Sequence, residues 1–357
     1  MTTYVVVALA VGGLGWLAEL CRREASRDEH VRRLGGFSAK ICAGLASCVL
    51  VLVAGCRWMV GTDFFQYGRN YPVYRDTVVR SIQSFDEPGI RVLAFLGSLL
   101  YDNPASMFFL ASVLAVGLAT RTLLKFAVSA GFVLSLYIFS GSWHGSFNVV
   151  RQSVAVAIVF AGHSFIVGRK FFKYLMAVAL AAAFHVSALP FVLLYWVPRR
   201  KLRLWWGIAI VALVFGATMF SGAILQLVAS SAEAENTGYL VRQVNPLRTA
   251  IAVAPVLLYV VFSSGKDSGT GDWFYRNMVL VHAAIVVLFA SSAYLFRYTL
   301  FTAIFLPIGL AKLTEFHDGV LRHWVRLFIL VLFGLVWYVE VSVSPDLVPF
   351  RWIWGSW

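Results

Sequence analysis

The chain has 357 residues, of which 60% are hydrophobic and only 13% are charged, and its formal net charge is +13. Ordinary soluble domains carry about a quarter of their residues as Asp, Glu, Lys and Arg, so this chain has too few polar side chains to cover a soluble protein of its length. The composition therefore argues against a soluble fold. Long apolar runs recur from Tyr4 to Val343, and they predict an all-α, polytopic transmembrane helical bundle.

The basic residues are grouped in short clusters between the apolar runs, where cytoplasmic loops would hold a helix bundle in one orientation. This distribution favours a membrane protein and argues against a nucleic-acid partner. The clusters hold 19 of the 30 Lys and Arg residues and comprise Arg22 to Lys40, Arg121 to Lys125, Arg169 to Lys173, Arg199 to Arg203, Lys266, and Lys312 to Arg326. If all of them are cytoplasmic, the N-terminus and the C-terminus both lie outside.

About ten spans follow from this assignment, within a single integral membrane domain that covers residues 1–357. In chain order they are 3–20, 41–60, 104–120, 126–141, 149–167, 204–226, 248–263, 274–292, 297–313 and 327–343. The large outer loops are then about 61–103 and 227–247. The run from Ile90 to Tyr101 is too short to span.

The segment from Phe171 to Val197 has two interpretations, because it is apolar throughout and has a basic cluster at each end. It forms either one long tilted helix, which would reverse every later span, or a re-entrant helical hairpin with its tip near residues 184–187. We favour the hairpin because it keeps the basic clusters on one side, and irregular backbone at depth is tolerated where it lines a cavity.

The eleven basic residues outside these clusters are all arginines. Ten of them map to the outer face: Arg57, Arg69, Arg75, Arg80, Arg91, Arg151, Arg242, Arg248, Arg297 and Arg351. Guanidinium groups suit phosphate and carboxylate oxygens, although a single arginine near a helix end can simply reach the headgroups. Arg151, flanked by Asn148 and Gln152 at the mouth of a span, and Arg297, which opens a span after a short turn, are the strongest candidates for ligand contact. Arg91 and Arg248 are further candidates for substrate binding.

Two other side chains are candidates for catalysis. His185 follows alanine-rich apolar sequence and is either a packed core histidine or a general base, since histidine titrates near neutral pH. Asp63, in the first outer loop, is either the partner of an arginine or a catalytic carboxylate. The sequence Asp86-Glu87-Pro88-Gly89 is typical of a turn.

Aromatic residues accompany these groups in the predicted outer regions. Tyr67, Tyr71 and Trp143 are candidates for holding sugar rings, although the same mixture of aromatic and polar residues suits a plain membrane-interface loop. The sequence has no phosphate-binding glycine loop, nucleotide fingerprint, His-Glu-x-x-His or Gly-x-Ser-x-Gly motif. We therefore expect no nucleotide, metal or other cofactor.

Several short stretches together resemble the EpsG family of exopolysaccharide polymerases. They lie between about residues 57 and 300 and comprise Gly61-Thr62-Asp63 with Tyr67 and Tyr71, residues 87–93, residues 148–155, residues 184–189, and Arg297-Tyr298. The chain departs from the family pattern at Ile90, where an aromatic residue is common.

The resemblance implies a Wzy-like polymerase, with a helical arrangement like that of GT-C membrane glycosyltransferases. Such enzymes join oligosaccharide repeat units carried on undecaprenyl diphosphate, at the outer face of the bacterial inner (cytoplasmic) membrane. The expected partners are these lipid-linked oligosaccharides, membrane lipids, a chain-length regulator and a flippase. Arg151 and Arg297 would bind the diphosphate, and His185 or Asp63 would orient or deprotonate the acceptor hydroxyl. An O-antigen-ligase-like glycan transferase and a polytopic glycan or lipid transporter remain alternatives.

Overall fold

The computed structural model describes residues 1–27, 32–126, 129–202, 244, 246–262, 273–315 and 319–355. Every regular element in these ranges is a helix, and β-pairing among them is limited to one isolated antiparallel bridge between Arg57 and Trp352. The chain divides into two compact units: Met1–Tyr195 with His323–Trp357, and Trp196–Arg322. The single membrane domain expected from the sequence stays a prediction, and each unit is described by itself.

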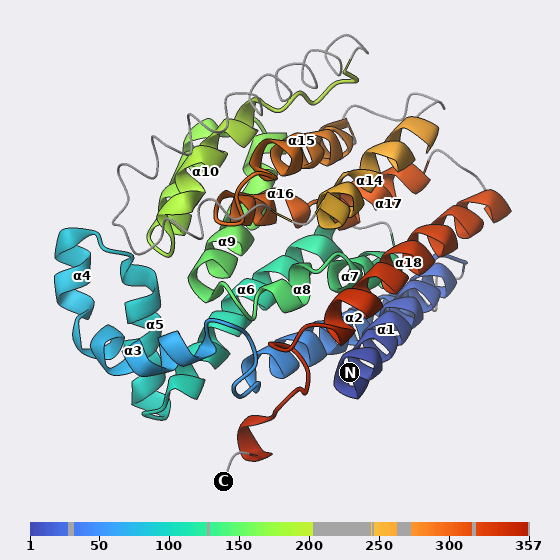
Figure 1. Cartoon of the computed structure of the whole chain (residues 1–357). Coiled ribbons are helices and arrows are strands. Elements are labelled where there is room, and N and C mark those ends of the chain that lie inside the picture. Colours follow the sequence, from blue (N-terminus) through green and yellow to red (C-terminus); the bar gives the residue numbers. More distant parts are fainter. Residues whose placement is uncertain are drawn as a thin grey trace. The chain divides into compact units, whose positions relative to one another are not determined.

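The first unit is built mainly from long apolar helices (Figure 1). They are α1 (Thr2–Arg27), α2 (Arg32–Gly55), α3 (Phe64–Asp76), α4 (Val78–Ser84), α5 (Pro88–Leu100), α6 (Pro104–Phe126), α7 (Ala130–Phe139), α8 (Ser142–Gly145), α9 (Val150–Val167), α10 (Phe171–Ala182), the 3-10 helix η1 (Val186–Trp196), most of α18 (Gly319–Ser342), and η4 (Ile353–Gly355).

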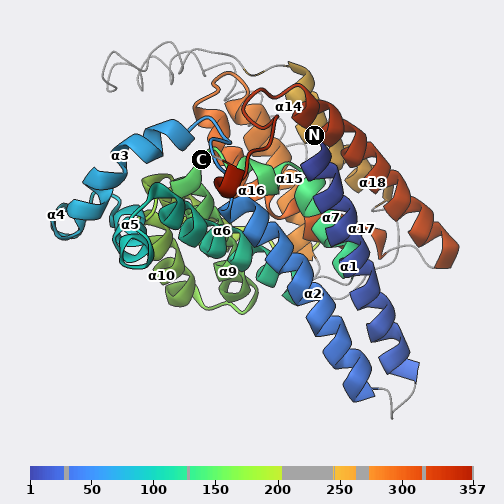
Figure 2. The ribbon, with the colours of Figure 1, turned by 90° about the horizontal axis from the view of Figure 1, so that it is seen from below.

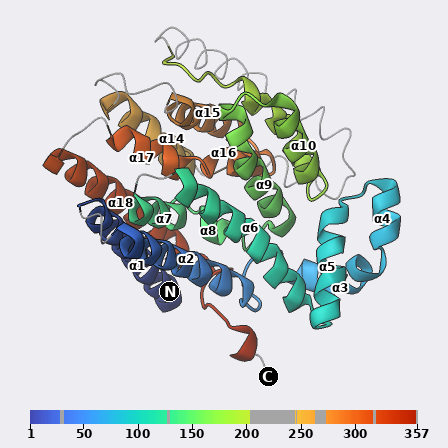
Figure 3. The ribbon, with the colours of Figure 1, turned by 180° about the vertical axis from the view of Figure 1, so that it is seen from behind.

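The long helices pack in a continuous series. Helices α1 and α2 run side by side (Figure 2), α2 packs on α6, α6 on α9, and α9 on α10 (Figure 3). Helix α7 packs on α1, where a Cβ atom on Gly15 would lie 2.6 Å from the Cα atom of Gly131. Only two glycines allow the backbones to approach this closely, so this pair sets the spacing between α1 and α7.

Loops predicted to lie outside the membrane meet at one end of this unit. The hydroxyl of Tyr4 donates a hydrogen bond to the carbonyl of Leu347 at 2.9 Å, and its ring packs edge-on against Trp143 and Phe350. We call this the Tyr4 end. It gathers the N-terminus of α1, the turn between α7 and α9, and the segment after α18.

The segment predicted to form a re-entrant hairpin does fold back on itself. The rings of Phe171 and Tyr195 lie 5.0 Å apart, and the Tyr174 hydroxyl donates to the carbonyl of Phe191 at 2.7 Å. A single straight helix would separate Phe171 from Tyr195 by about 36 Å, so one long helix is excluded. The chain reverses between α10 and η1, near His185.

The second unit contains α14 (Pro246–Phe262), α15 (Trp273–Phe289), η3 (Leu295–Thr299), α16 (Leu300–Ala303) and α17 (Leu306–Thr314). Polar side chains near the start of α15 donate hydrogen bonds to the backbone of two other segments of this unit. The amide nitrogen of Asn277 donates to the carbonyls of Pro198 at 2.7 Å and Arg200 at 3.0 Å. Arg276 donates from Nη2 to the carbonyl of Lys312 at 3.2 Å.

Five helices within the described residues are long and apolar enough to cross a membrane, or six if one bent pair counts as a span. They are Thr2–Glu24, Gly35–Gly55, Pro104–Phe126, Val150–Val167 and Gly319–Ser342, and the bent pair is Leu295–Ala303 with Leu306–Thr314, at 44°. Where the sequence predicts a span at 126–141, the structure has only the ten-residue helix α7, which is about 15 Å long. The predicted span 204–226 and nearly all of the loop 227–247 lie outside the described residues, so the count of ten stays a prediction.

Candidate functional site

Helix α3 presents one polar and aromatic face to the rest of the first unit, because Tyr67, Tyr71 and Arg75 recur every fourth residue. Its first residue, Phe64, stacks on Phe108 of α6 with ring centroids 4.5 Å apart. Tyr67 and Tyr71 are buried, with exposed fractions of 5% and 3%. Their hydroxyl groups point to two different clusters of charged side chains.

The first cluster consists of Tyr67, Glu87, Arg151 and His185, and we call it the Arg151 cluster. Arg151, in the first turn of α9, donates from Nε to the Tyr67 hydroxyl at 2.9 Å and forms an ion pair from Nη1 with Oε2 of Glu87. Within the described residues no hydrogen-bond partner is found for Nη2, and 33% of the side chain is exposed. Of the two nitrogens at the Nη1–Nη2 edge of the guanidinium, only Nη1 is therefore paired within the described residues.

Glu87 also binds the imidazole of His185. Its Oε1 lies 2.5 Å from Nδ1 of His185 and accepts a longer hydrogen bond, 3.4 Å, from the backbone nitrogen of Val186. Because an ionised carboxylate only accepts hydrogen bonds, we assign the proton of a neutral His185 to Nδ1 and the lone pair to Nε2. In the described part of the chain Nε2 contacts no hydrogen-bonding group, and 29% of the side chain is exposed.

The turn that carries Glu87 docks directly on the tip of the hairpin. The backbone nitrogen of Gly89 donates to the carbonyl of Ala183 at 2.8 Å, and a Cβ atom at Gly89 would lie 2.6 Å from the ring of Phe184. Glu87 itself has left-handed backbone geometry, φ 43°, which costs a non-glycine residue about 1–2 kcal/mol. Strain of this kind persists where surrounding contacts fix it, and it is common at functional sites.

The charges of the cluster keep Glu87 ionised. Burial raises the pKa of its carboxyl group, but the hydrogen bond from His185 and the positive charge of Arg151 outweigh burial, so that the pKa lies below its ordinary value. Burial raises the pKa of Tyr67, so its hydroxyl stays neutral at physiological pH. The cluster therefore joins the Arg151 cation to the Glu87 anion, and the same carboxylate is hydrogen-bonded to the imidazole of His185.

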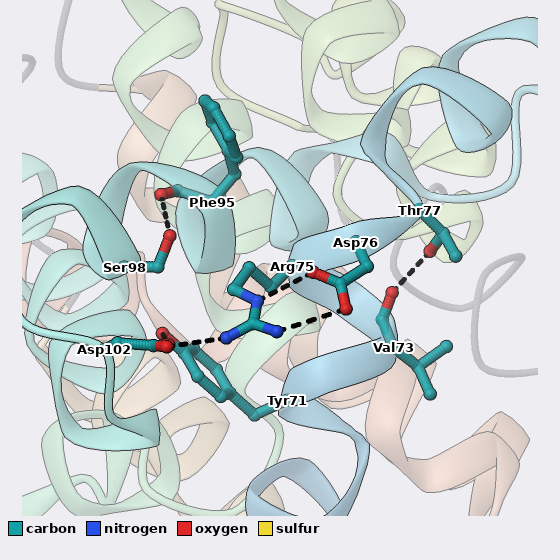
Figure 4. Close-up of polar contacts among 8 residues, drawn as sticks. All are labelled: Tyr71, Val73, Arg75, Asp76, Thr77, Phe95, Ser98 and Asp102. Carbon is teal, nitrogen blue, oxygen red and sulfur yellow. Dashed lines mark hydrogen bonds and ion pairs between the residues drawn. The ribbon is translucent and has the colours of Figure 1, made fainter.

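The second cluster consists of Tyr71, Arg75, Asp76 and Asp102, and we call it the Arg75 cluster (Figure 4). Arg75 donates from Nε and Nη2 to Asp76, at 2.7 and 3.2 Å, and from Nη1 to Asp102 at 2.6 Å. The Tyr71 hydroxyl donates to the other oxygen of Asp102 at 3.1 Å. All three nitrogens of this guanidinium are engaged, and two carboxylates surround one cation.

Other residues predicted to bind substrate have internal partners. Arg91 forms an ion pair with Asp86 at 2.5 Å and donates to the Thr77 hydroxyl at 3.1 Å, which holds α5 against the start of α4. The side-chain oxygen of Asn148 accepts from the backbone nitrogen of Thr62 at 3.0 Å. Gln152 is buried, with 4% exposure. These contacts give Arg91 and Asn148 positions that support the site.

The three aromatic residues predicted to hold sugar rings, Tyr67, Tyr71 and Trp143, are buried, and that role stays a prediction. Trp143 is fully buried and donates from its indole nitrogen to the carbonyl of Leu50 at 3.1 Å. Tyr67 and Tyr71 are nearly as buried, because the face of α3 that carries them packs on α5 and α6. None of the three presents an open ring face, and the Tyr67 hydroxyl accepts a hydrogen bond from Arg151.

The remaining predicted residues are Asp63, Arg297 and Arg248. Asp63 precedes α3 and accepts from the Thr62 hydroxyl at 3.1 Å. Arg297 lies in η3 of the second unit and is partly exposed. Arg248 lies in α14, and its side chain is outside the described part. Within the described residues, no three His, Cys, Asp or Glu side chains form a group that could hold a metal ion.

Sequence reasoning missed Glu87 as a member of the site. Its sequence, Asp86-Glu87-Pro88-Gly89, predicts a turn, and the structure agrees, but the turn also delivers a carboxylate to Arg151 and His185. The signal was present in the stretch 87–93, where an acidic residue directly precedes Pro-Gly at the start of an apolar helix.

These features define a helical, multi-pass membrane protein with a partly open arginine and a histidine held by one carboxylate. The sequence model of the EpsG family matches residues 40–352. The chain belongs to the EpsG family, a Wzy-like family, and is a membrane protein of the exopolysaccharide-polymerase type. No curated protein and no solved structure matches the chain.

Proposed function

We propose that this protein is a polysaccharide polymerase that joins undecaprenyl-diphosphate-linked oligosaccharide repeat units on the outer face of the bacterial inner membrane. The observation that carries the proposal is the Arg151 cluster. There, a guanidinium edge suited to phosphate and a histidine nitrogen suited to accept a proton are held by the two oxygens of Glu87. Family membership supports the same class of reaction.

The proposed reaction transfers the growing glycan from one lipid carrier to a new repeat unit. A hydroxyl oxygen of the acceptor sugar attacks the anomeric carbon of the donor glycan. The bond from that carbon to the diphosphate oxygen breaks, and undecaprenyl diphosphate leaves with the bonding electrons. The hydroxyl proton passes to Nε2 of His185, so no further reactant is required.

Each proposed residue has a separate role in this reaction. Arg151, through Nη2 and its paired Nη1, stabilises the charge that develops on the leaving diphosphate. Arg297, in the other unit, stays a predicted substrate-binding residue. Tyr67 holds Nε of Arg151 and so orients the guanidinium. His185 is favoured over Asp63 as the base because the Glu87 hydrogen bond leaves its Nε2 as an acceptor.

The polymerase proposal is tested by supplying purified undecaprenyl-diphosphate-linked repeat units to the protein in lipid nanodiscs. A ladder of products that differ by one repeat unit is the expected result on a gel. A single addition to a different acceptor lipid would identify a ligase instead. If the units stay unjoined but cross a vesicle membrane, the protein is a transporter and the proposal is wrong.

The outer location has its own test. Phe85 is exposed beside the Glu87 turn, so a cysteine placed there, after serine replaces the four native cysteines, should react with a membrane-impermeant maleimide added to spheroplasts. A cysteine in the Arg169–Lys173 cluster, such as Lys173→Cys, should react only after the membrane is permeabilised. Labelling at these two positions in the opposite sense would overturn the proposed orientation.

A further inference from the structure

Glu87 connects the two halves of the proposed reaction. Its Oε2 pairs with Arg151, the residue proposed to bind the donor diphosphate, and its Oε1 binds Nδ1 of His185, the residue proposed to deprotonate the acceptor. A diphosphate that approaches Arg151 therefore meets a carboxylate already on the same guanidinium. The two anions compete for Nη1.

We propose that donor binding displaces Glu87 from Arg151 and thereby activates His185, so that Glu87 is a positioning residue that couples the two substrates. This inference rests on the proposed polymerase function. It goes beyond that function by assigning an order: the donor diphosphate binds first, and the acceptor hydroxyl is deprotonated afterwards.

The contacts around Arg151 allow a diphosphate to replace Glu87 without reorienting the guanidinium. Tyr67 holds Nε at 2.9 Å and does not depend on Glu87. Once Oε2 leaves, Nη1 and Nη2 form one open edge that can hold two phosphate oxygens in parallel. The guanidinium thus keeps its orientation while it changes its anion.

The contacts around Glu87 also survive the exchange. Its Oε1 remains between His185 Nδ1 and the backbone nitrogen of Val186. The turn itself stays docked through the hydrogen bond from Gly89 to Ala183. The carboxylate therefore remains on the imidazole when it loses Arg151.

The loss of Arg151 changes what Glu87 does to the imidazole. A carboxylate whose charge is shared with a guanidinium is a weak acceptor, whereas the same carboxylate without that partner accepts more strongly from Nδ1–H and better stabilises the imidazolium. Nε2 then becomes more basic only when a donor occupies Arg151. Without a donor, Arg151 weakens the base.

The test measures donor affinity and turnover separately in Glu87→Gln, which keeps the side-chain shape and removes the charge. Affinity for undecaprenyl diphosphate, measured by titration in nanodiscs, should rise about fivefold to tenfold because the competing anion is gone. Turnover with saturating lipid-linked repeat units should fall at least about tenfold, because the imidazolium loses its counter-ion. Affinity and turnover thus move in opposite directions.

Asp76→Asn is the matched control. It removes one negative charge from the neighbouring Arg75 cluster, where Arg75 keeps Asp102 as a partner. Both affinity and turnover should match the wild type. Parallel changes in Asp76→Asn and Glu87→Gln would mean that bulk charge explains the result, and would overturn the coupling.

Other outcomes in Glu87→Gln also decide the matter. Unchanged affinity would show that Glu87 and the diphosphate do not compete, and unchanged turnover would show that Glu87 does not act on His185. A fall in both would indicate a structural role. If the wild type makes no polymer, the proposed function fails, while diphosphate affinity still reports whether the two anions compete.

A measurement on the wild-type protein removes dependence on the folding of the variant. With 15N-labelled histidine, the Nδ1–H signal of His185, assigned by its loss in His185→Gln, should move downfield when undecaprenyl diphosphate saturates the protein. A signal that stays in place at saturation would contradict the coupling.

Discussion

Arg75 lies on the same face of α3 as Tyr67 and Tyr71, and Arg151 contacts this face from α9, yet the surroundings of the two arginines differ. Arg75 has all three nitrogens on two carboxylates, as Figure 4 shows. Arg151 has a neutral hydroxyl on Nε and one carboxylate on Nη1, and this carboxylate is shared with His185. Both arginines were predicted to lie at the outer face. The number of anionic partners, rather than this location, distinguishes a residue that can take a ligand from one that fastens two segments together.

The largest expected effect within the Arg151 cluster is that of His185→Ala. Loss of a general base lowers turnover by about 10²- to 10⁴-fold, while diphosphate affinity should stay near that of the wild type because Arg151 is intact. The measurement is initial polymer formation at saturating donor. His323→Ala on α18, an exposed position, serves as the control and should keep full activity. Full activity in His185→Ala would remove His185 from the mechanism and return Asp63 as the candidate base.

A smaller effect is expected from Gly89→Ala. The added Cβ atom would overlap the ring of Phe184, so the Glu87 turn and the hairpin tip must separate by a few tenths of an ångström or more. Turnover should fall about tenfold, since misplacement of about 1 Å can cost up to a hundredfold. Adding Phe184→Leu should restore part of the loss. The absence of any recovery in this double variant would show that the contact between Gly89 and Phe184 does not place Glu87.

The smallest effect concerns stability against acid. The pKa of Glu87 is lowered in the folded protein, so its contribution to stability is present above the ordinary glutamate pKa, near 4.3, and is lost as the pH falls through the folded value. The unfolding temperature of the wild type in detergent should therefore exceed that of Glu87→Gln by a few degrees at pH 7. The difference should shrink as the pH falls through the folded pKa of Glu87. A difference that stays the same across the whole acid range would mean that the ion pair is not its source.

The sequence was sufficient to predict much of the membrane scaffold. Hydropathy located α1, α2, α6, α9 and α18, and the basic clusters favoured a reversal near residues 184–187, which the contact of Phe171 with Tyr195 bears out. The predicted helix length was wrong at α7, because only ten residues of the predicted span 126–141 form this helix. A run of apolar residues indicates burial in lipid or protein, but it does not fix where a helix ends.

The site itself was only half predictable. Arg151 and His185 stood out as polar groups in apolar surroundings, but Glu87 is separated from them by 64 and 98 positions, and only tertiary packing brings the three together. The sequence also did not show whether an aromatic ring faces the surface or the protein interior. Tyr67, Tyr71 and Trp143 have the composition of a sugar-binding loop, yet all three are turned into the protein.

The central claim is most directly tested by comparing Arg151→Ala with Arg75→Ala in the ladder assay, using purified lipid-linked repeat units and equal amounts of folded protein. Arg151→Ala should reduce polymer formation by about 10²- to 10³-fold, as expected for loss of a group that stabilises a developing charge. Arg75→Ala should stay within about twofold of the wild type, because exposed ion pairs contribute little. A ladder of normal length and rate from Arg151→Ala, or equal losses in both variants, would contradict the account.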